Sequence, residues 1–457
     1  MAVPRLTRPT RAQLSRRGFL AAGAGTAGLT GLALAGCRGP GASDSAAFDY
    51  MTWGSSFEAD GVNAALDAFA DEKGIDAKPL NVPYDEYAAK LNSLIAAGTP
   101  PDAGYVQEGM AMQLGEQGKV VSIADRDEFA GWLPIAKHYW DEENAVGVIA
   151  LEVITMFHSV EAVQAAGVAP PATMDTSWDW DTFVEQADAL TKDASGRSPS
   201  ESGFDAGDVR QYGVAVPTDL PTLHSLFASN GLSLFNEDGT ECLIASPEAI
   251  EVVQALSDLI YTHRVAPTPA QASAMGSGSA LLLESGRVAM VMGGQWSLID
   301  LAAGDLEYGL GVHPTFGVPA ICVVGGANAA FVDSGNEDLA LEWMAYEASP
   351  ETVSLYRDGL WMPMEEKYYT DDELISTWVN DDVHTPAYRT ACVDPLVQHG
   401  VPYFSFKIKN FPEIEGVLGG GIAPIFAEQT DVAAALEALA AEVAPLMQGA
   451  YPDLVEG

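Results

Sequence analysis

Basic residues are scarce in this chain. Its 457 residues include 22 Lys and Arg against 64 Asp and Glu, and five of the arginines precede Cys37, where no acidic residue occurs. The rest of the chain therefore carries 64 acidic and 17 basic side chains. Such a surface repels nucleic acid and anionic lipid, which argues against both as partners. The charge fits either a high-salt adaptation or solubility outside an anionic cell envelope.

Cysteine is also rare, with four in the whole chain. Apart from Cys37 these are Cys242, Cys322 and Cys392, an odd number whose spacing fits no metal-binding motif. At most one disulfide can form among them, and we expect small, buried apolar side chains instead. The sequence therefore predicts no metal site and no cofactor.

The N-terminal segment has the order of features of an export signal. Residues 15–20, SRRGFL, form a twin-arginine pattern, and an Ala/Gly/Leu run too short and too weakly apolar for a stable membrane span follows. The run ends in LAGC, which resembles the bacterial lipoprotein box, in which Cys37 becomes a lipid-bearing first residue. We predict a signal peptide over 1–36 and a lipidated Cys37 that opens a flexible tether over 37–47. The alternative is a hydrophobic leader with an incidental cysteine.

The body after the tether has the length of about two or three domains and a hydrophobic share of 48%, which indicates folded globular structure. Strand patterns near 48–53, 80–82 and 103–106 alternate with helical patterns, the first with apolar positions at 62, 65, 66 and 69. This order predicts an α/β fold with a parallel sheet covered by helices. Ligands of such sheets bind at the carboxyl ends of the strands. The loops there carry Ser55, Tyr84, Gln107 and Glu108.

The most informative stretch is 284–300, ESGRVAMVMGGQWSLID. It predicts a buried strand that runs into Gly293 and Gly294, where the backbone turns sharply close to a guest, and then Trp296. An indole offers a flat apolar face and one N–H donor, which suits the C–H face and polar edge of a sugar ring. The alternative is a core tryptophan after a tight turn.

A single acid, Glu152, interrupts the long strand-like segment 147–157, GVIALEVITMF. A carboxylate among apolar neighbours is costly unless something bonds to it. We interpret Glu152 as an acceptor for the hydroxyls of a ligand, with a salt bridge or an edge position as the alternative.

Several segments together resemble the extracellular solute-binding proteins of ATP-driven importers, in the carbohydrate-binding class that includes maltose-binding protein. The resemblance rests on Gly286, Gly293, Gly294 and Trp296, on Gly325 and Gly326, and on 339–350, LALEWMAYEASP, which makes Trp343 a packing residue. Glu152 matches an acid on the family's first crossing between lobes, and Trp296 matches its stacking tryptophan. The first-lobe loop differs from that of maltose-binding protein, which argues against maltose itself.

The resemblance implies a two-lobed periplasmic-binding-protein type II fold with hinge crossings between the lobes, each lobe a mostly parallel sheet flanked by helices. We assign 48–152 and 324–373 to lobe 1, and 153–323 and 374–457 to lobe 2. Later loops add Asp219, Trp361 and Tyr403, with core packing as the alternative for Trp361. The predicted ligand-binding set is Trp53, Ser55, Tyr84, Gln107, Glu108, Glu152, Asp219, Trp296, Gly326, Trp361 and Tyr403.

The expected function is that of a monomeric, non-enzymatic lipoprotein on the outer face of the cytoplasmic membrane. It would capture a sugar or oligosaccharide by hinge closure and deliver it to the membrane subunits of an ABC permease. Three alternatives stay open: a polyamine or peptide as the ligand, since an acidic rim suits a cation; a sensor or adhesion lipoprotein with the same fold; and a secreted glycosidase, although no carboxylate pair stands out in the sequence.

Overall fold

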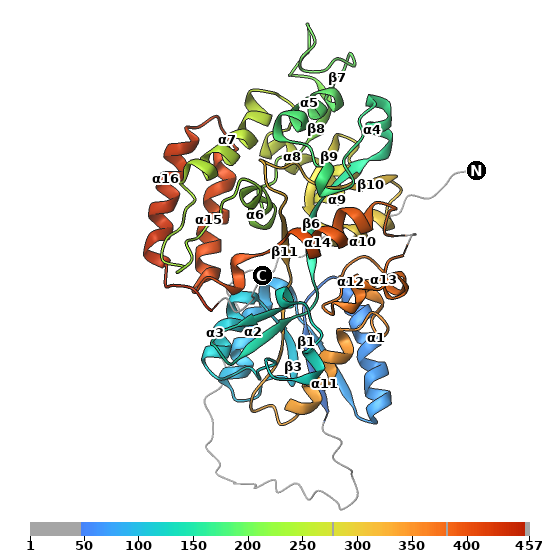
Figure 1. The fold of residues 1–457 in the computed structure, drawn as a ribbon, viewed down its shortest axis with the longest axis vertical. Helices are drawn as coiled ribbons and strands as arrows, with labels where there is room; N and C mark the ends of the chain where they lie inside the picture. Colours follow the sequence, from blue (N-terminus) through green and yellow to red (C-terminus); the bar gives the residue numbers. More distant parts are fainter. Residues whose placement is uncertain (1–46, 277, 381–382, 453–457) are drawn as a thin grey trace, which may run out of the picture. The chain divides into compact units, whose positions relative to one another are not determined.

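The computed structural model describes residues 47–276, 278–380 and 383–452. Two β-sheets organise this part of the chain (Figure 1). The strands of the first sheet, in spatial order, are β2 (Ala77–Asn81), β1 (Phe48–Thr52), β3 (Ala103–Val106), β12 (Ala327–Ala330), β5 (Ala145–Val148) and β4 (Lys137–Tyr139). Those of the second are β13 (Gly400–Pro402), β11 (Ile321–Val324), β6 (Glu152–Ser159), β9 (Val288–Gly294), β8 (Val209–Val214) and β7 (Lys192–Asp193), with β10 (Tyr308–Gly311) paired to β6.

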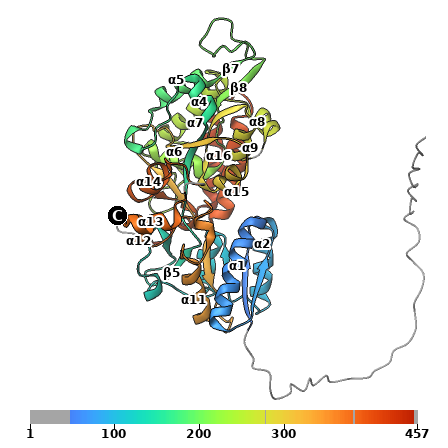
Figure 2. The same cartoon turned by 90° about the vertical axis from the view of Figure 1, so that its right-hand side faces the viewer.

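The first sheet begins with the strand-helix-strand order that the sequence predicts. Helix α1 (Ser56–Lys73) starts at the Ser55 N-cap and ends at Gly74, whose φ of 67° is left-handed. Its buried positions Val62, Leu66 and Phe69 follow the predicted helical spacing. Because β1 lies between β2 and β3, right-handed crossovers put α1 and α2 (Tyr84–Ala96) on opposite faces of the sheet (Figure 1, Figure 2). Helices α3 (Glu108–Glu116) and α11 (Glu337–Glu347) contact β12.

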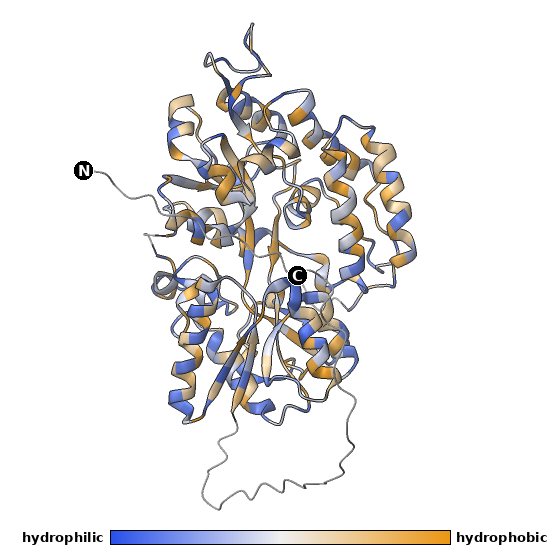
Figure 3. Cartoon of the chain, turned by 180° about the vertical axis from the view of Figure 1, so that it is seen from behind, coloured by the Kyte–Doolittle hydropathy of each residue, from blue (hydrophilic) through white to orange (hydrophobic). Residues whose placement is uncertain are grey.

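Helices also surround the second sheet. In Figure 3 the central strands are orange, whereas the helices alternate orange and blue, as expected when one face of each helix is buried. Helix α7 (Pro247–Tyr261) is well buried and contacts α16 (Val432–Val443), which in turn contacts α15 (Phe411–Ile425). The remaining α-helices of the described ranges are α4 (Val160–Ala166), α5 (Trp180–Leu190), α6 (Leu220–Ser229), α8 (Pro269–Met275), α9 (Ser279–Glu284), α10 (Leu298–Ala303) and α14 (Asp394–His399), together with α12 (Lys367–Thr370) and α13 (Asp372–Trp378), which lie on the side of the first sheet (Figure 1, Figure 2).

The predicted α/β class and two-sheet architecture are confirmed, but the sheets are mixed and not mostly parallel. In the first sheet only the β1·β2 and β1·β3 pairs are parallel, and in the second only β8·β9 and β11·β13. The reason is that β12 and β11 belong to the returning chain, so β12 runs antiparallel to β3 and β5, and β11 runs antiparallel to β6. The strand and helix order near the start of the chain predicts only the parallel strand pairs of the first sheet.

The chain passes from one sheet to the other within the segment 147–157, which the sequence predicts as one strand. Strand β5 ends at Val148 and β6 begins at Glu152, so two strands of different sheets replace it. The chain returns between β11 and β12, through Gly325 and Gly326. We call 149–151 and 325–326 the crossing segments. The strands change sheet close to the limits that we propose for the two lobes.

Three further sequence expectations concern single side chains. Cys242, Cys322 and Cys392 are free thiols, and the last two are fully buried. Trp343 is fully buried against Tyr50 and Phe69, which confirms its packing role. None of the helices within the described ranges has the length and apolarity to cross a membrane.

A buried carboxyl lies within the core of the first sheet. Glu347 on α11 accepts hydrogen bonds from the Tyr50 hydroxyl at 2.6 Å and from Asn328 Nδ2 at 2.7 Å. Burial raises the pKa of Glu347 from 4.5 to about 8, although these two hydrogen bonds act in the opposite direction. The side chain is therefore protonated at neutral pH in the folded protein.

We predict that Glu347 makes stability fall as pH rises. Its pKa in the folded state is above its unfolded value, so the folded state binds the extra proton between pH 4.5 and about 8. Glu347→Gln stays neutral and avoids this loss. The free energy of unfolding of Glu347→Gln minus that of the wild type should therefore increase from pH 5 to pH 8, by at most about 4 kcal/mol.

Urea unfolding at several pH values measures this difference. The matched control is Glu342→Gln, which removes an exposed carboxyl from the same helix. A Glu347→Gln variant whose stability difference from wild type is the same at pH 5 and pH 8 would contradict the prediction.

Candidate functional site

A cavity of about 450 Å³ lies at the crossing segments, a volume within the range of small-molecule sites. It is lined by residues that follow the ends of strands in both sheets, including Trp53 after β1 and Trp296 after β9. We call it the cleft. Its lining residues are Trp53, Glu58, Tyr84, Ile149, Ala150, Glu152, Trp296, Gly326, Leu360 and Trp361. Six of the eleven residues that the sequence predicts are thus brought together.

The first-sheet side of the cleft is a cluster of edge-on aromatic rings. The Trp53 ring centroid lies 4.8 Å from that of Tyr87, 5.1 Å from Tyr105 and 5.4 Å from Tyr84. Trp361 contacts Tyr105 at 6.5 Å and is only 3% exposed, so it serves both the core and the cleft wall. Because Tyr87 and Tyr105 are fully buried, they hold the two indoles in place.

Trp296 is positioned by the glycine that precedes it in β9. The sequence predicts a sharp turn at Gly293 and Gly294, but both are the last residues of the strand, and Gly294 has extended φ and ψ of −70° and 141°. A Cβ at Gly294 would lie 2.1 Å from the Trp296 indole, so only glycine lets the ring fold back over the strand end. Gln295 Nε2 donates to the Leu360 carbonyl at 2.7 Å and ties this turn to the Trp361 loop.

Two carboxyls, Glu58 and Glu152, line the same cleft. Each keeps part of its surface open to solvent but lies against the aromatic walls. Burial raises the pKa of Glu58 to about 7. Burial, then the charges of Glu58 and Glu108, raise the pKa of Glu152 well above its ordinary value. The cleft can therefore offer acceptors when ionised and O–H donors when protonated.

The remaining predicted residues of the strand-end loops lie outside the cleft lining. Ser55 caps α1 by accepting from the Glu58 backbone N–H at 3.3 Å, and Asp219 caps α6 by accepting from the Thr222 N–H at 2.9 Å. Gln107 lies close enough to Tyr84, and Glu108 close enough to Glu152, to shift the pKa of these two residues. Ser55 and Asp219 are thus occupied with helix capping, whereas Gln107 and Glu108 support residues of the cleft.

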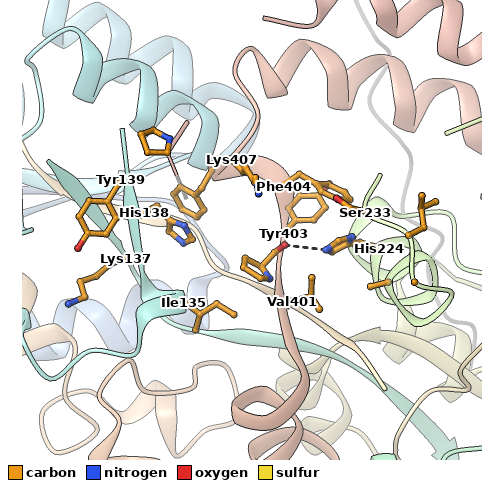
Figure 4. A pocket seen from close by; sticks show the side chains of 16 residues that line it. Ile135, Lys137, His138, Tyr139, His224, Ser233, Val401, Tyr403, Phe404 and Lys407 are labelled. Atoms are coloured by element: carbon orange, nitrogen blue, oxygen red, sulfur yellow. Dashed lines mark hydrogen bonds between the residues drawn. The ribbon is translucent and has the colours of Figure 1, made fainter. Parts of the chain in front are cut away.

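Tyr403 lines a different cavity, of about 390 Å³ (Figure 4). Its hydroxyl donates to Glu415 at 2.8 Å. A small adjoining pocket shares Tyr403 and reaches Leu151 and Gly325. Leu151 and Gly325 directly precede Glu152 and Gly326, which line the cleft. Because successive residues of an extended chain face opposite ways, the cavity of Figure 4 lies on the side of the crossing segments opposite to the cleft. We call it the rear cavity, and Tyr403 does not meet Trp296.

The bacterial extracellular solute-binding protein family matches residues 64–387 of this sequence. The chain belongs to this family. Among curated proteins, none is similar enough to this solute-binding protein to count as a match.

Solved structures similar to this solute-binding protein share its fold. An ABC substrate-binding protein from Listeria monocytogenes in complex with cycloalternan has a TM-score of 0.71 and 20% identity, over 88% of this chain and 98% of that chain. The GacH receptor of Streptomyces glaucescens, solved unliganded and with acarbose, has a TM-score of 0.69 and 16% identity, over 87% and 98%. A solute-binding protein from Thermotoga lettingae bound to alpha-D-tagatose has a TM-score of 0.68 and 18% identity, over 88% and 100%.

The sequence analysis missed four lining residues of the cleft, the apolar Ile149, Ala150 and Leu360 and the acidic Glu58. Of these, Glu58 is the one that carries an ionisable group. Ser55 and Glu58 have the spacing of a capping box, in which the glutamate bonds back to the N-cap. Only the first half forms, since Ser55 accepts from the Glu58 N–H while the Glu58 carboxyl faces the cleft. Gly54, with φ of 125°, leaves room for it, because a Cβ there would lie 2.1 Å from Glu58 Oε2. In the sequence, Gly54 immediately before the N-cap Ser55 was the feature that could have indicated this position of the Glu58 side chain.

We predict that Gly294→Ala displaces the Trp296 indole without unfolding the protein. The added methyl meets the ring at 2.1 Å, so the indole must leave its place in the cleft. A crystal structure of the variant should show a different Trp296 rotamer, and thermal unfolding should shift by a few degrees at most. Gly416→Ala is the matched control, since a Cβ at Gly416 meets nothing within 4 Å. An unmoved indole in the variant would contradict this account.

Proposed function

We propose that this chain is a substrate-binding lipoprotein of an ABC importer that captures a sugar or oligosaccharide in the cleft and delivers it to the membrane permease. The observation that carries the proposal is the cleft itself, in which three indoles and Tyr84 accompany two carboxyls. Aromatic faces cover the apolar side of a sugar ring, while carboxyl groups replace the water that its hydroxyls lose. The sugar and oligosaccharide ligands named for the similar structures support this ligand class.

The predicted lobes and hinge give this capture a mechanism. Lobe 1 comprises 48–152 and 324–373, and lobe 2 comprises 153–323 and 374–457. Both crossing segments lie close to limits between the lobes, and a third crossing lies near Leu374. Closure about these segments would bring Trp296 towards Trp53, and the permease would recognise the closed form. A ligand favours closure only through the extra contacts that it makes in that form.

The proposed protein acts as a monomer and catalyses no reaction. The family membership supports a binding role. Glu58 and Glu152 share one cavity, which is also what a glycosidase would need, so the two functions must be separated by experiment. Incubation with oligosaccharides should produce no new reducing ends.

A saccharide screen tests the proposed ligand class. Isothermal titration of the purified protein with mono- and oligosaccharides should identify a binder, and Trp296→Ala should weaken that binding about 10- to 100-fold through loss of ring stacking and buried area. Trp180→Ala is the matched control, since Trp180 stacks on Phe316 and does not line the cleft. Binding of polyamines or peptides alone, with no saccharide bound, would refute the proposal.

The proposed anchor rests on Cys37, which lies outside the described residues, as do the twin arginines and the tether up to residue 46. A mature protein that starts with a lipid-bearing cysteine stays with the membrane, because acyl chains partition into the bilayer. Cys37→Ser should therefore shift the exported protein from the membrane fraction to the soluble fraction. Cys242→Ser is the control and should remain in the membrane fraction. Equal fractionation of wild type and Cys37→Ser would remove the anchor from the proposal.

A further inference from the structure

The cleft carries ionisable groups of one sign. Among the described residues that line it, Glu58 and Glu152 are acidic and none is Lys, Arg or His. A third carboxyl, that of Glu108, lies close enough to raise the pKa of Glu152. An anionic sugar such as a uronate would therefore find no cationic partner among the described lining residues, and ionised carboxyls would repel it.

The overall shortage of basic residues does not explain this distribution. The rear cavity, on the other side of the crossing segments, contains Lys137, His138, His224 and Lys407, and no acid is found among its described lining residues (Figure 4). Two cavities separated by a few residues of backbone thus have opposite ionisable groups. The acidic character of the cleft is therefore not shared by the neighbouring cavity.

The two carboxyls of the cleft also lack partners. Neither the Glu58 nor the Glu152 side chain makes a hydrogen bond or ion pair with the described part of the chain. Glu347 and Glu415, in contrast, each accept a hydrogen bond from a tyrosine hydroxyl. Two unpaired carboxylates against apolar walls repel each other, and either protons or a cation must relieve that repulsion.

Aromatic rings supply a second attraction for positive charge in the same place. Trp53, Tyr84, Trp296 and Trp361 all line the cleft, and the faces of such rings attract ammonium groups. Gly326 lets Trp53 approach the crossing segment, since a Cβ there would lie 3.0 Å from the Trp53 ring. Rings on several sides and unpaired carboxyls form the combination that proteins use to bind amines.

We infer that the ligand is a saccharide that carries a protonated amine, and that Glu58 and Glu152 bind this ammonium group while the indoles cover the sugar ring. This inference rests on the proposed function and narrows it from sugars in general to amino sugars. A neutral sugar would form only hydrogen bonds between its hydroxyls and the carboxyls. The ammonium would in addition neutralise them and form charge-assisted hydrogen bonds, which are about twice as strong as neutral ones.

Matched ligands test the charge directly. Isothermal titration of the full-length protein would compare glucosamine oligomers with the N-acetylglucosamine, glucose and glucuronate oligomers of the same length, and with putrescine. We expect the amine form to bind at least about tenfold tighter than the N-acetyl and glucose forms. The glucuronate form should not bind. The preference should shrink as salt is raised.

Isosteric variants test the residues. Glu58→Gln and Glu152→Gln should each reduce affinity for the glucosamine oligomer by about tenfold and bring it closer to that of the N-acetyl form. Glu161→Gln is the matched control, because it removes an exposed acid on α4 outside the cleft. Thermal unfolding of each variant confirms that it is folded, and the wild-type ligand comparison does not depend on any variant.

The outcomes separate this inference from the proposed function. Equal or tighter binding of the N-acetyl or glucose oligomer overturns the inference and leaves a neutral-sugar binding protein. The same holds if the carboxamide variants weaken all sugars equally. Binding of putrescine without any saccharide, or of no saccharide at all, overturns the proposed function together with the inference.

Discussion

The site depends on how closely the two crossing segments approach each other. The Ile149 N–H donates to the Gly326 carbonyl at 2.7 Å, and a Cβ at Gly325 would lie 2.2 Å from the Ala150 carbonyl oxygen. No side chain other than hydrogen fits there. This contact places Glu152 and Gly326, which are far apart in sequence, at one cavity. It also lets the strand pairing of one sheet continue almost directly into that of the other.

The sequence predicted features that depend on local repetition. Val62, Leu66 and Phe69 repeat at helical spacing because α1 must bury one face, and the early βαβ order follows from the same rule. The break between β5 and β6 was not predicted, since 147–157 is apolar on both sides of it and periodicity does not show which sheet a strand joins. Pairing across the molecule, not local preference, decides that break.

The site was predicted in part for a similar reason. Trp296 and Glu152 stood out because an indole after glycines and an acid within a strand are unusual in their local setting. Tyr403 and Asp219 were predicted from their positions in later loops. In the structure the Tyr403 hydroxyl bonds to Glu415 behind the crossing segments, and the Asp219 carboxyl caps α6. Glu58 was hidden by a capping-box spacing that the structure uses only by half. Such choices between two local partners are decided by tertiary packing.

The cleft is an open edge of the first-sheet core. Trp53 and Trp361 both lean on Tyr105, which itself packs against Tyr50, the donor to Glu347. Because these contacts already hold the two indoles in place, a ligand that binds them does not have to order them, and this lowers the entropic cost of binding. Trp296 gains its rigidity differently, from Gly294 and from the Gln295 bond to Leu360.

Glu347, Glu58 and Glu152 differ in their hydrogen-bond partners, and this difference separates a carboxyl that serves the fold from two that are available to a ligand. Glu347 lies in the same core as the cleft wall, and its Oε2 receives two hydrogen bonds, so its burial is partly compensated within the fold, although its buried Oε1 has no partner among the described residues. Glu58 and Glu152 receive none, although burial raises the pKa of both. Asparagine or tyrosine partners of the kind that serve Glu347 would stabilise the free protein but would occupy the groups that a ligand needs. Unpaired carboxyls among rigid rings are a departure from the rule that buried polar groups are satisfied, and such departures concentrate where proteins bind.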